Sequence, residues 1–130
     1  MWIKGNLHCH SNNSSDGEVS VAELCQWYRA HKYGLLAITD HNSITDLTGI
    51  AGPGQLALVP RSVEIGEQTE NILAIGVADM PPRGQTNQAT IDEIRNRGGM
   101  AILAHPNWRW NHWTAKDLVT LHGYVGIEVL

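Results

Sequence analysis

The chain has 130 residues, a length that suits one domain with a modest hydrophobic core. Hydrophobic residues make up 42% and charged residues 17% of it, which excludes an intrinsically disordered protein. The net charge of −4 and the scattered lysines and arginines exclude a basic patch for nucleic acid or an anionic membrane. The apolar runs are too short to span a bilayer, and 2 cysteines are too few for a disulfide framework. We therefore expect a cytoplasmic protein.

The first half of the chain predicts a strand, a helix and two further strands. The helix begins at Ser20, where Glu23 completes a capping box three residues later, and it ends before Gly34. Short apolar runs around this helix predict strands at residues 2–8, 35–39 and 56–63.

The second half continues the same alternation. One helix is predicted to begin near Thr90, with Glu93 in the capping position, and to end at Gly98. Another begins at Thr114, with Asp117 placed likewise, and ends before Gly123. The apolar runs of this half predict strands at residues 72–77, 100–104 and 124–130.

The alternation of strands and helices is typical of a largely parallel α/β sheet or barrel. We expect residues 1–130 to form a single domain, since no repeat or long linker divides the chain. The last predicted strand runs to the end of the sequence, and a closed barrel needs more chain than this. The sequence is therefore expected to be a piece of a longer fold, incomplete at the C-terminus.

Two histidines mark the end of the first predicted strand. His8 and His10 are separated by Cys9, so an extended backbone directs both imidazoles to one face and the cysteine to the other. Neutral imidazole is a good ligand for zinc, iron and manganese. The pair alone is weak evidence, because a motif this short also arises by chance.

Other metal-binding residue types also follow predicted strands. Asp40 and His41 come after the second strand, Glu64 after the third and His105 after the fifth. Asp16, in the loop after the first strand, is close enough in sequence to reach the same place. Because the carboxyl ends of parallel strands converge in α/β barrels, we expect these side chains to surround one metal site.

These motifs resemble, in order, those of the PHP (polymerase and histidinol phosphatase) superfamily. The matching segments are His8-Cys9-His10-Ser11, Ser15-Asp16-Gly17, Ile38-Thr39-Asp40-His41-Asn42, Val63-Glu64-Ile65 and Ala104-His105-Pro106. The resemblance implies a distorted seven-stranded β/α (TIM-like) barrel that holds two or three divalent ions. The segments around His105 and around Glu128 are similar to a branch that includes carbamate-hydrolysing enzymes.

The resemblance also implies roles for individual residues. His8 and His10 would bind a first ion, and Glu64 would bridge it to a second ion that His105 binds. Asp16 and His41 would bind a third ion, and Asp40 would orient an imidazole or a bound water. The predicted catalytic residues are Asp40, His41 and Glu64. A mixed set of imidazoles and carboxylates suits zinc, manganese or iron equally.

The chain departs from the family pattern at two places. Asn71 stands where many members have a histidine, and an amide oxygen is a weaker, harder ligand than an imidazole. The aspartate and histidine of the family's last motif, which would complete the first and third ions, are missing from this sequence.

Candidate substrate-binding residues are Arg109, Trp108 and Asn71. The tryptophans at 108, 110 and 113, together with His112, form either a lid over the metals or packing at the rim of the barrel. Arg109 either contacts an anionic substrate or is a solvated loop residue. Glu128 either faces the site or lies in solvent. The sequence leaves these alternatives open.

The leading functional hypothesis is a phosphoesterase that uses metal-bound hydroxide on a small phosphorylated molecule. A second hypothesis is metal-dependent hydrolysis of a carbamate, amide or carboxyl ester. A third is a non-catalytic, metal-stabilised domain, because Asn71 and the missing last motif both weaken the cluster. The oligomeric state is not predicted.

Overall fold

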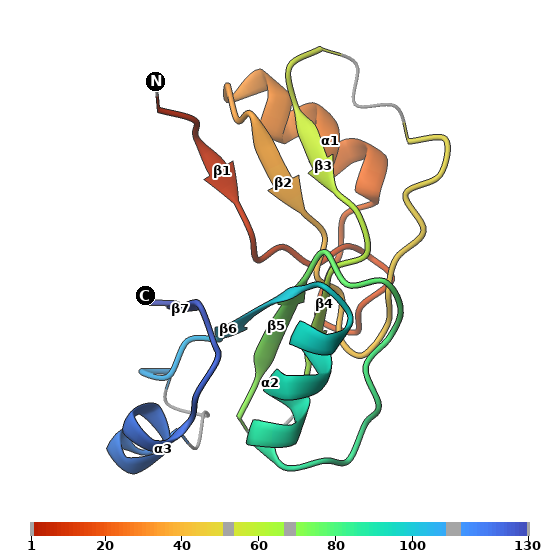
Figure 1. Cartoon of the computed structure of the whole chain (residues 1–130). Helices are drawn as coiled ribbons and strands as arrows, with labels where there is room; N and C mark the ends of the chain where they lie inside the picture. The colour runs from red at the N-terminus through yellow and green to blue at the C-terminus, as the bar shows by residue number, and fades with distance from the viewer. Residues whose placement is uncertain (1, 51–53, 67–69, 109–112, 130) are drawn as a thin grey trace.

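The computed structural model describes residues 2–50, 54–66, 70–108 and 113–129, and these form a mixed α/β fold (Figure 1). Its helices are α1 (Val21–Ala30), α2 (Asn87–Asn96) and α3 (Ala115–Thr120). Its strands are β1 (Gly5–Asn6), β2 (Leu35–Ala37), β3 (Ala57–Val59), β4 (Val63–Ile65), β5 (Ile72–Ile75), β6 (Met100–Leu103) and β7 (Gly126–Ile127). No helix among these residues is long and apolar enough to cross a membrane.

The first sheet has the order β1-β2-β3, and both of its pairings are parallel. Helix α1 covers one face of this sheet, which gives the upper part of the molecule in Figure 1. The helix buries Val21 and Cys25 against Leu36 and Ile38 of the sheet. Removing these apolar side chains from water is the main force that holds the helix on the sheet.

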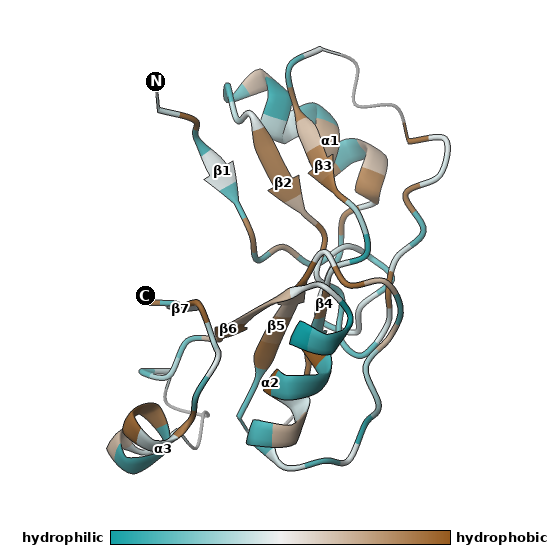
Figure 2. Ribbon diagram, viewed as in Figure 1, coloured by the Kyte–Doolittle hydropathy of each residue, from teal (hydrophilic) through white to brown (hydrophobic). Residues whose placement is uncertain are grey.

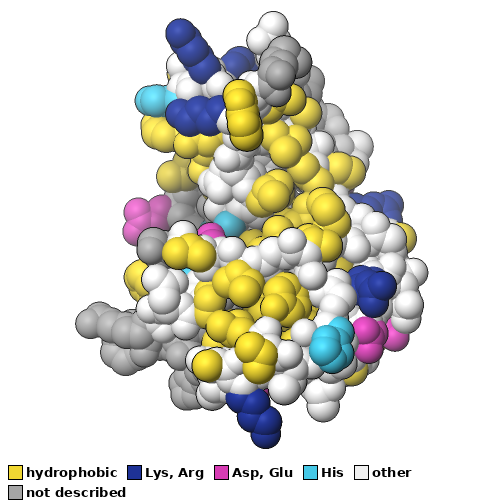
Figure 3. Space-filling view, turned by 60° about the vertical axis from the view of Figure 1, so that its left-hand side comes forward, with side chains coloured by type: hydrophobic (Ala, Val, Ile, Leu, Met, Phe, Trp, Pro, Cys, Tyr) yellow, Lys and Arg dark blue, Asp and Glu magenta, His cyan; other side chains and the backbone are white. Residues whose placement is uncertain are grey.

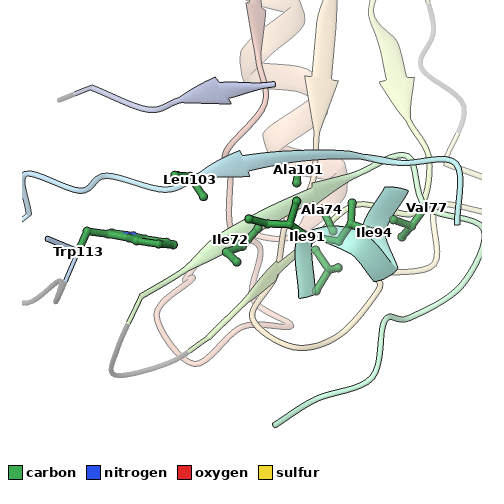
Figure 4. Close-up of a cluster of buried hydrophobic side chains, with 9 residues drawn as sticks. Ile72, Ala74, Val77, Ile91, Ile94, Ala101, Leu103 and Trp113 are labelled. Atoms are coloured by element: carbon green, nitrogen blue, oxygen red, sulfur yellow. The ribbon is translucent and has the colours of Figure 1, made fainter. Parts of the chain in front are cut away.

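The second sheet has the order β4-β5-β6-β7, with two antiparallel pairings followed by a parallel one. Strand β5 is buried along its whole length and is strongly hydrophobic in Figure 2. Helix α2 packs on β5 and β6, where Ile91 and Ile94 meet Val77 and Ala101 (Figure 4). Trp113 closes the other end of this core.

The expectation of a largely parallel sheet holds for the first sheet and is wrong for the second. The strand predicted at residues 56–63 divides into β3 and β4, which belong to different sheets. Between them Arg61 adopts a left-handed backbone conformation with φ of 51°, which turns the chain from one sheet to the other. The sequence carries a signal for this break in Pro60-Arg61-Ser62, which interrupts the apolar residues and which the prediction of a single strand did not use.

The two sheets meet at one isolated parallel bridge between His41 and Glu64. Within the described residues the strands form two sheets and not one closed barrel. Strands β1 and β7 each have a single partner and lie on the same side of the molecule (Figure 1). Figure 3 brings this side forward and shows hydrophobic side chains on it, and the exposed apolar residues of the chain include Ile3 and Ile127.

The capping signals locate two of the three helix starts. Ser20 and Thr114 are the N-caps of α1 and α3, and each forms the predicted capping box. Helix α2 begins earlier than predicted, because the hydroxyl of Thr86 accepts the hydrogen bond from the backbone N–H of Ala89. Thr90, the predicted start, is instead a buried residue inside α2.

We predict that Val77→Ala lowers the free energy of unfolding by about 2 kcal/mol, since it removes two buried methyl groups and leaves a cavity beside α2. Val119→Ala makes the same chemical change on the exposed side of α3 and should alter stability by less than about 0.5 kcal/mol. Urea unfolding of both variants measures the difference. Equal effects would contradict the assignment of Val77 to the core.

Candidate metal centre

The two histidines after β1 face the same side, as predicted. Their Nε2 atoms lie 3.2 Å apart, whereas Cys9 packs with the cluster under α1. The backbone between them is fixed by Thr39, whose hydroxyl accepts the Cys9 N–H at 3.0 Å. The extended segment therefore presents His8 and His10 together to the space between the two sheets.

Glu64 lies at the centre of four imidazoles. Its side chain is 1% exposed, and its Oε1 is 3.1 Å from Nε2 of His105. The other carboxylate oxygen, Oε2, is 3.0 Å from Nε2 of His8, 2.8 Å from that of His10 and 3.5 Å from that of His41. Four histidines from three parts of the sequence thus share one carboxylate. The expectation that Glu64 follows a strand is wrong, because it lies within β4, whereas the histidines do follow β1, β2 and β6.

The backbone places these side chains at the junction of the sheets. His41 follows β2 and pairs with Glu64 of β4 through the isolated bridge, which brings the end of one sheet against the other. His105 follows β6 and has φ of 27°, a left-handed conformation that non-glycine residues seldom adopt. Such a conformation costs about 1–3 kcal/mol and is commonly kept at functional sites.

Asp16 joins the cluster from the loop after β1. Both of its carboxylate oxygens lie 2.9 Å from Nδ1 of His10, and Oδ2 is 3.4 Å from Nε2 of His41. The Ser14 hydroxyl donates to Asp16 at 2.7 Å and accepts the His41 N–H at 3.1 Å. The predicted neighbours Asp16 and His41 are therefore adjacent, and the ligation of a third ion by them stays a prediction.

Asp40 is fully buried beside the cluster. Its carboxylate accepts hydrogen bonds from the N–H of Ser11 at 2.6 Å, from the Ser11 hydroxyl at 2.7 Å and from the Thr45 hydroxyl. These bonds tie the segment after His10 to the segment after β2. The structure thus gives Asp40 a role in holding the two ligand-bearing segments together, and its catalytic role stays a prediction.

Asn71 lies directly behind Glu64. It is 8% exposed, and its Nδ2 donates to Glu64 Oε1 at 2.9 Å, the same oxygen that His105 contacts. Its Oδ1 is buried and has no hydrogen-bond partner among the described residues. Asn71 therefore contacts the central carboxylate directly, and binding of substrate by Asn71 stays a prediction.

The tryptophans after His105 do not all have the same role: one lies beside the centre and one packs in the core. Trp108 is 50% exposed, with its ring 6.4 Å from that of His105, so it lies beside the centre. Trp113 is buried and packs in the core of the second sheet. Arg109, Trp110 and His112 lie outside the described residues, and the proposed contact of Arg109 with substrate stays a prediction.

Glu128 is the site residue that the sequence left undecided. It follows β7, and its Oε2 lies 2.9 Å from Nδ1 of His8 and accepts the backbone N–H of His105 at 3.2 Å. Its position at the end of a strand was the available signal. That signal does not separate a carboxylate facing the site from one in solvent.

Hydrogen bonds between imidazoles and carboxylates set the protonation of His8 and Glu64. Burial favours neutral imidazole at His8, but hydrogen bonds to Glu128 and Glu64 outweigh it and raise the pKa of His8 to about 9. Burial also opposes ionisation of Glu64, yet the hydrogen bonds from His10, His105 and His8 hold its pKa far below the ordinary range. A protonated His8 therefore lies between the carboxylates of Glu64 and Glu128.

The same side chains fit divalent ions. Two groups of three ligand atoms lie within 4.8 Å of one another, namely His8 with Glu64 and His105, and His10 with His41 and Glu64. Within the first group, Nε2 of His8 and of His105 lie 3.0 and 3.1 Å from the Glu64 oxygens, close to the separation of ligand atoms at tetrahedral zinc, about 3.3 Å. Ions would replace the shared protons of this network.

A family model matches most of the segment that carries this centre. The model described as the PHP domain matches residues 6–93, more than half of the chain and a range that includes Glu64 and three of its four histidines. No curated protein matches the chain significantly.

Two solved structures share the fold. One is a two-domain protein from Bacteroides vulgatus ATCC 8482 that contains a predicted PHP-like metal-dependent phosphoesterase, with a TM-score of 0.70 and 18% identity over 90% of this chain. The chain spans 40% of the length of that protein. The other is an amidohydrolase from Chromobacterium violaceum, solved with bound sulfate and no metal, with a TM-score of 0.74 and 16% identity; the match covers 95% of this chain and 76% of that one.

The raised pKa of His8 makes the stability of the metal-free protein depend on pH. The protonated imidazole stabilises the fold fully below pH 6.5, its ordinary pKa, and this contribution is lost as the pH rises through about 9. We predict that the free energy of unfolding of chelator-treated protein falls over this range by up to about 3 kcal/mol.

Denaturant unfolding at several pH values measures this dependence, and two histidine variants locate it. In His8→Gln the free energy of unfolding should fall less between pH 6.5 and 9. His122→Gln, which changes an exposed histidine outside the centre, should behave like the wild type. A His8→Gln protein with the full wild-type fall would contradict the assignment.

Proposed function

Since the chain belongs to the PHP domain family, we propose that it is a metal-dependent hydrolase with its ions bound around Glu64. The observation that carries the proposal is the contact of one buried carboxylate with four imidazoles. A structural role for so many titratable groups at one point is costly, because each must be desolvated. Functional sites are where such clusters are commonly found.

The ligand residues form two groups that share Glu64. His8 and His105 would hold one ion with Glu64, and His10 and His41 would hold another with the same carboxylate. This division follows the proximity of the ligand atoms and differs from the one that the family resemblance implied, in which His8 and His10 share an ion. When bound, divalent ions lower the pKa of a coordinated water and withdraw electron density from a phosphoryl or carbonyl oxygen. The negative charge of Glu64 would offset part of the ionic charge, and zinc, manganese and iron all suit this ligand set.

For the substrate we propose a phosphate ester of a small molecule. Support comes from the Bacteroides vulgatus protein, which contains a predicted PHP-like metal-dependent phosphoesterase. A second candidate is an amide, carbamate or carboxyl ester, and the amidohydrolase from Chromobacterium violaceum favours it. We also propose that the two sheets belong to a distorted β/α barrel, in which β1 and β7 would be joined by further strands.

A substrate panel separates the two candidates. The full chain, loaded in turn with Zn²⁺, Mn²⁺ and Fe²⁺, is assayed on chromogenic phosphate esters, carboxyl esters, carbamates and anilides. Preferential turnover of phosphate esters supports a phosphoesterase. Preferential turnover of carboxyl esters, carbamates or anilides contradicts a phosphoesterase and supports the second candidate.

We predict that Glu64→Gln abolishes metal-dependent turnover, with a loss of at least about 100-fold, because glutamine keeps the shape but not the charge that binds both ions. Elemental analysis should find a parallel loss of bound metal. Glu18→Gln, which makes the same change on an exposed residue, should keep both. A folded Glu64→Gln protein with wild-type turnover would defeat the mechanism.

We predict that Asn71→His tightens the binding of the ion at His105 about tenfold, because it adds an imidazole next to Glu64 Oε1. Asn71→Leu, similar in size but without a ligand atom, serves as the control. Chelator competition measures both affinities, and thermal unfolding checks that each variant is folded. Equal affinities in the two variants would count against a metal at this position.

A further inference from the structure

Glu128 connects the end of the second sheet to ligands on both sheets. The parallel ladder of β6 and β7 ends with Leu103 opposite Ile127, and the backbone N–H of Glu128 continues it by donating to Leu103 at 2.9 Å. This register places the carboxylate beside His8, which is 120 residues earlier in the chain. Its side chain is 25% exposed, so most of it is enclosed by the centre.

We propose that Glu128 is a positioning residue that aligns His8 and His105 for metal binding, an inference that rests on the proposed metal centre. An ionised carboxylate only accepts hydrogen bonds, so its contact with Nδ1 of His8 requires a proton on that nitrogen. With its proton on Nδ1, neutral His8 has its lone pair on Nε2, the nitrogen that faces Glu64 and would bind a metal. Glu128 thereby fixes both the tautomer and the orientation of the ring.

The same carboxylate oxygen also holds His105. It accepts the backbone N–H of this residue, at the position where the chain has the left-handed φ of 27°. That backbone directs Nε2 of His105 to the second oxygen of Glu64. One oxygen atom of Glu128 thus aligns one ligand from the first sheet and one from the second.

Asp16 shows that this arrangement recurs within the centre. It contacts Nδ1 of His10 as Glu128 contacts Nδ1 of His8, so both histidines of the pair have a carboxylate behind the ring. The two carboxylates differ in origin, because Asp16 lies six residues from His10 whereas Glu128 must be brought in by β7. Correct seating of β7 is therefore a requirement for the His8–Glu64–His105 group.

The test compares Glu128→Leu with Glu18→Leu, which removes an exposed carboxylate of the same kind. Glu128→Leu should weaken zinc binding about 10- to 100-fold in chelator competition, and Glu18→Leu should leave it unchanged. If Glu128→Leu does not fold, Glu128→Asp takes its place: it keeps the charge but shortens the side chain, and it should weaken zinc binding in the same direction.

A nuclear magnetic resonance readout separates alignment from general stability. In zinc-loaded wild type the Nδ1 proton of His8 should appear downfield and be protected from solvent exchange, and in Glu128→Leu it should not be protected. Wild-type zinc affinity in a folded Glu128 variant, or an unchanged His8 proton, would overturn the inference. A wild-type protein that binds no zinc would instead be a failure of the proposed function, and the inference would fall with it.

Discussion

The buried carboxylate of Glu64 is the constraint on which the rest of the centre depends. An ionised group that is 1% exposed is very unfavourable without compensation, and here four imidazoles and the Asn71 amide supply it. Because these five partners come from four segments, the charge is stable only when the ends of β1, β2 and β6 and the start of β5 meet at the same place. The fold must therefore form before the charge of Glu64 is compensated, and the compensated charge in turn stabilises the fold.

The architecture follows from this requirement. Parallel strands of the first sheet bring the segments carrying His10 and His41 together. The antiparallel pairing of β4 and β5 sets Leu73 opposite Glu64, and Asn71, two residues before Leu73, reaches the Glu64 carboxylate with its side chain. Among the described residues one isolated β-bridge, at His41 and Glu64 themselves, joins the two sheets, and Ala37 of the first sheet packs with Leu73 and Ile75 of the second. Around this bridge the buried carboxylate of Asp40 fixes the loops, and the carboxylates of Asp16 and Glu128 fix the rings. The ligands are thus held by carboxylates in addition to the backbone.

Much of the centre was predictable because strand ends and side-chain alternation are local properties of the sequence. The histidines at 8, 10, 41 and 105 follow strands and meet around Glu64, although Glu64 itself lies within β4 and not after it. The capping boxes of α1 and α3 were likewise predictable, since each depends on two residues three positions apart. The division of residues 56–63 into two strands was missed although Pro60-Arg61-Ser62 interrupts the apolar residues, and only the left-handed backbone at Arg61 shows how sharply the chain turns there. The role of Glu128 depends on the docking of β7, a contact across 120 residues.

The most direct test of a shared metal centre is an anomalous difference map from crystals of the full chain grown with Zn²⁺, recorded at the zinc absorption edge. The account predicts peaks beside Glu64, one between His8 and His105 and one between His10 and His41. A well-ordered Glu64 with its imidazoles in contact and no anomalous peak nearby, in crystals that contain ample zinc, would contradict it.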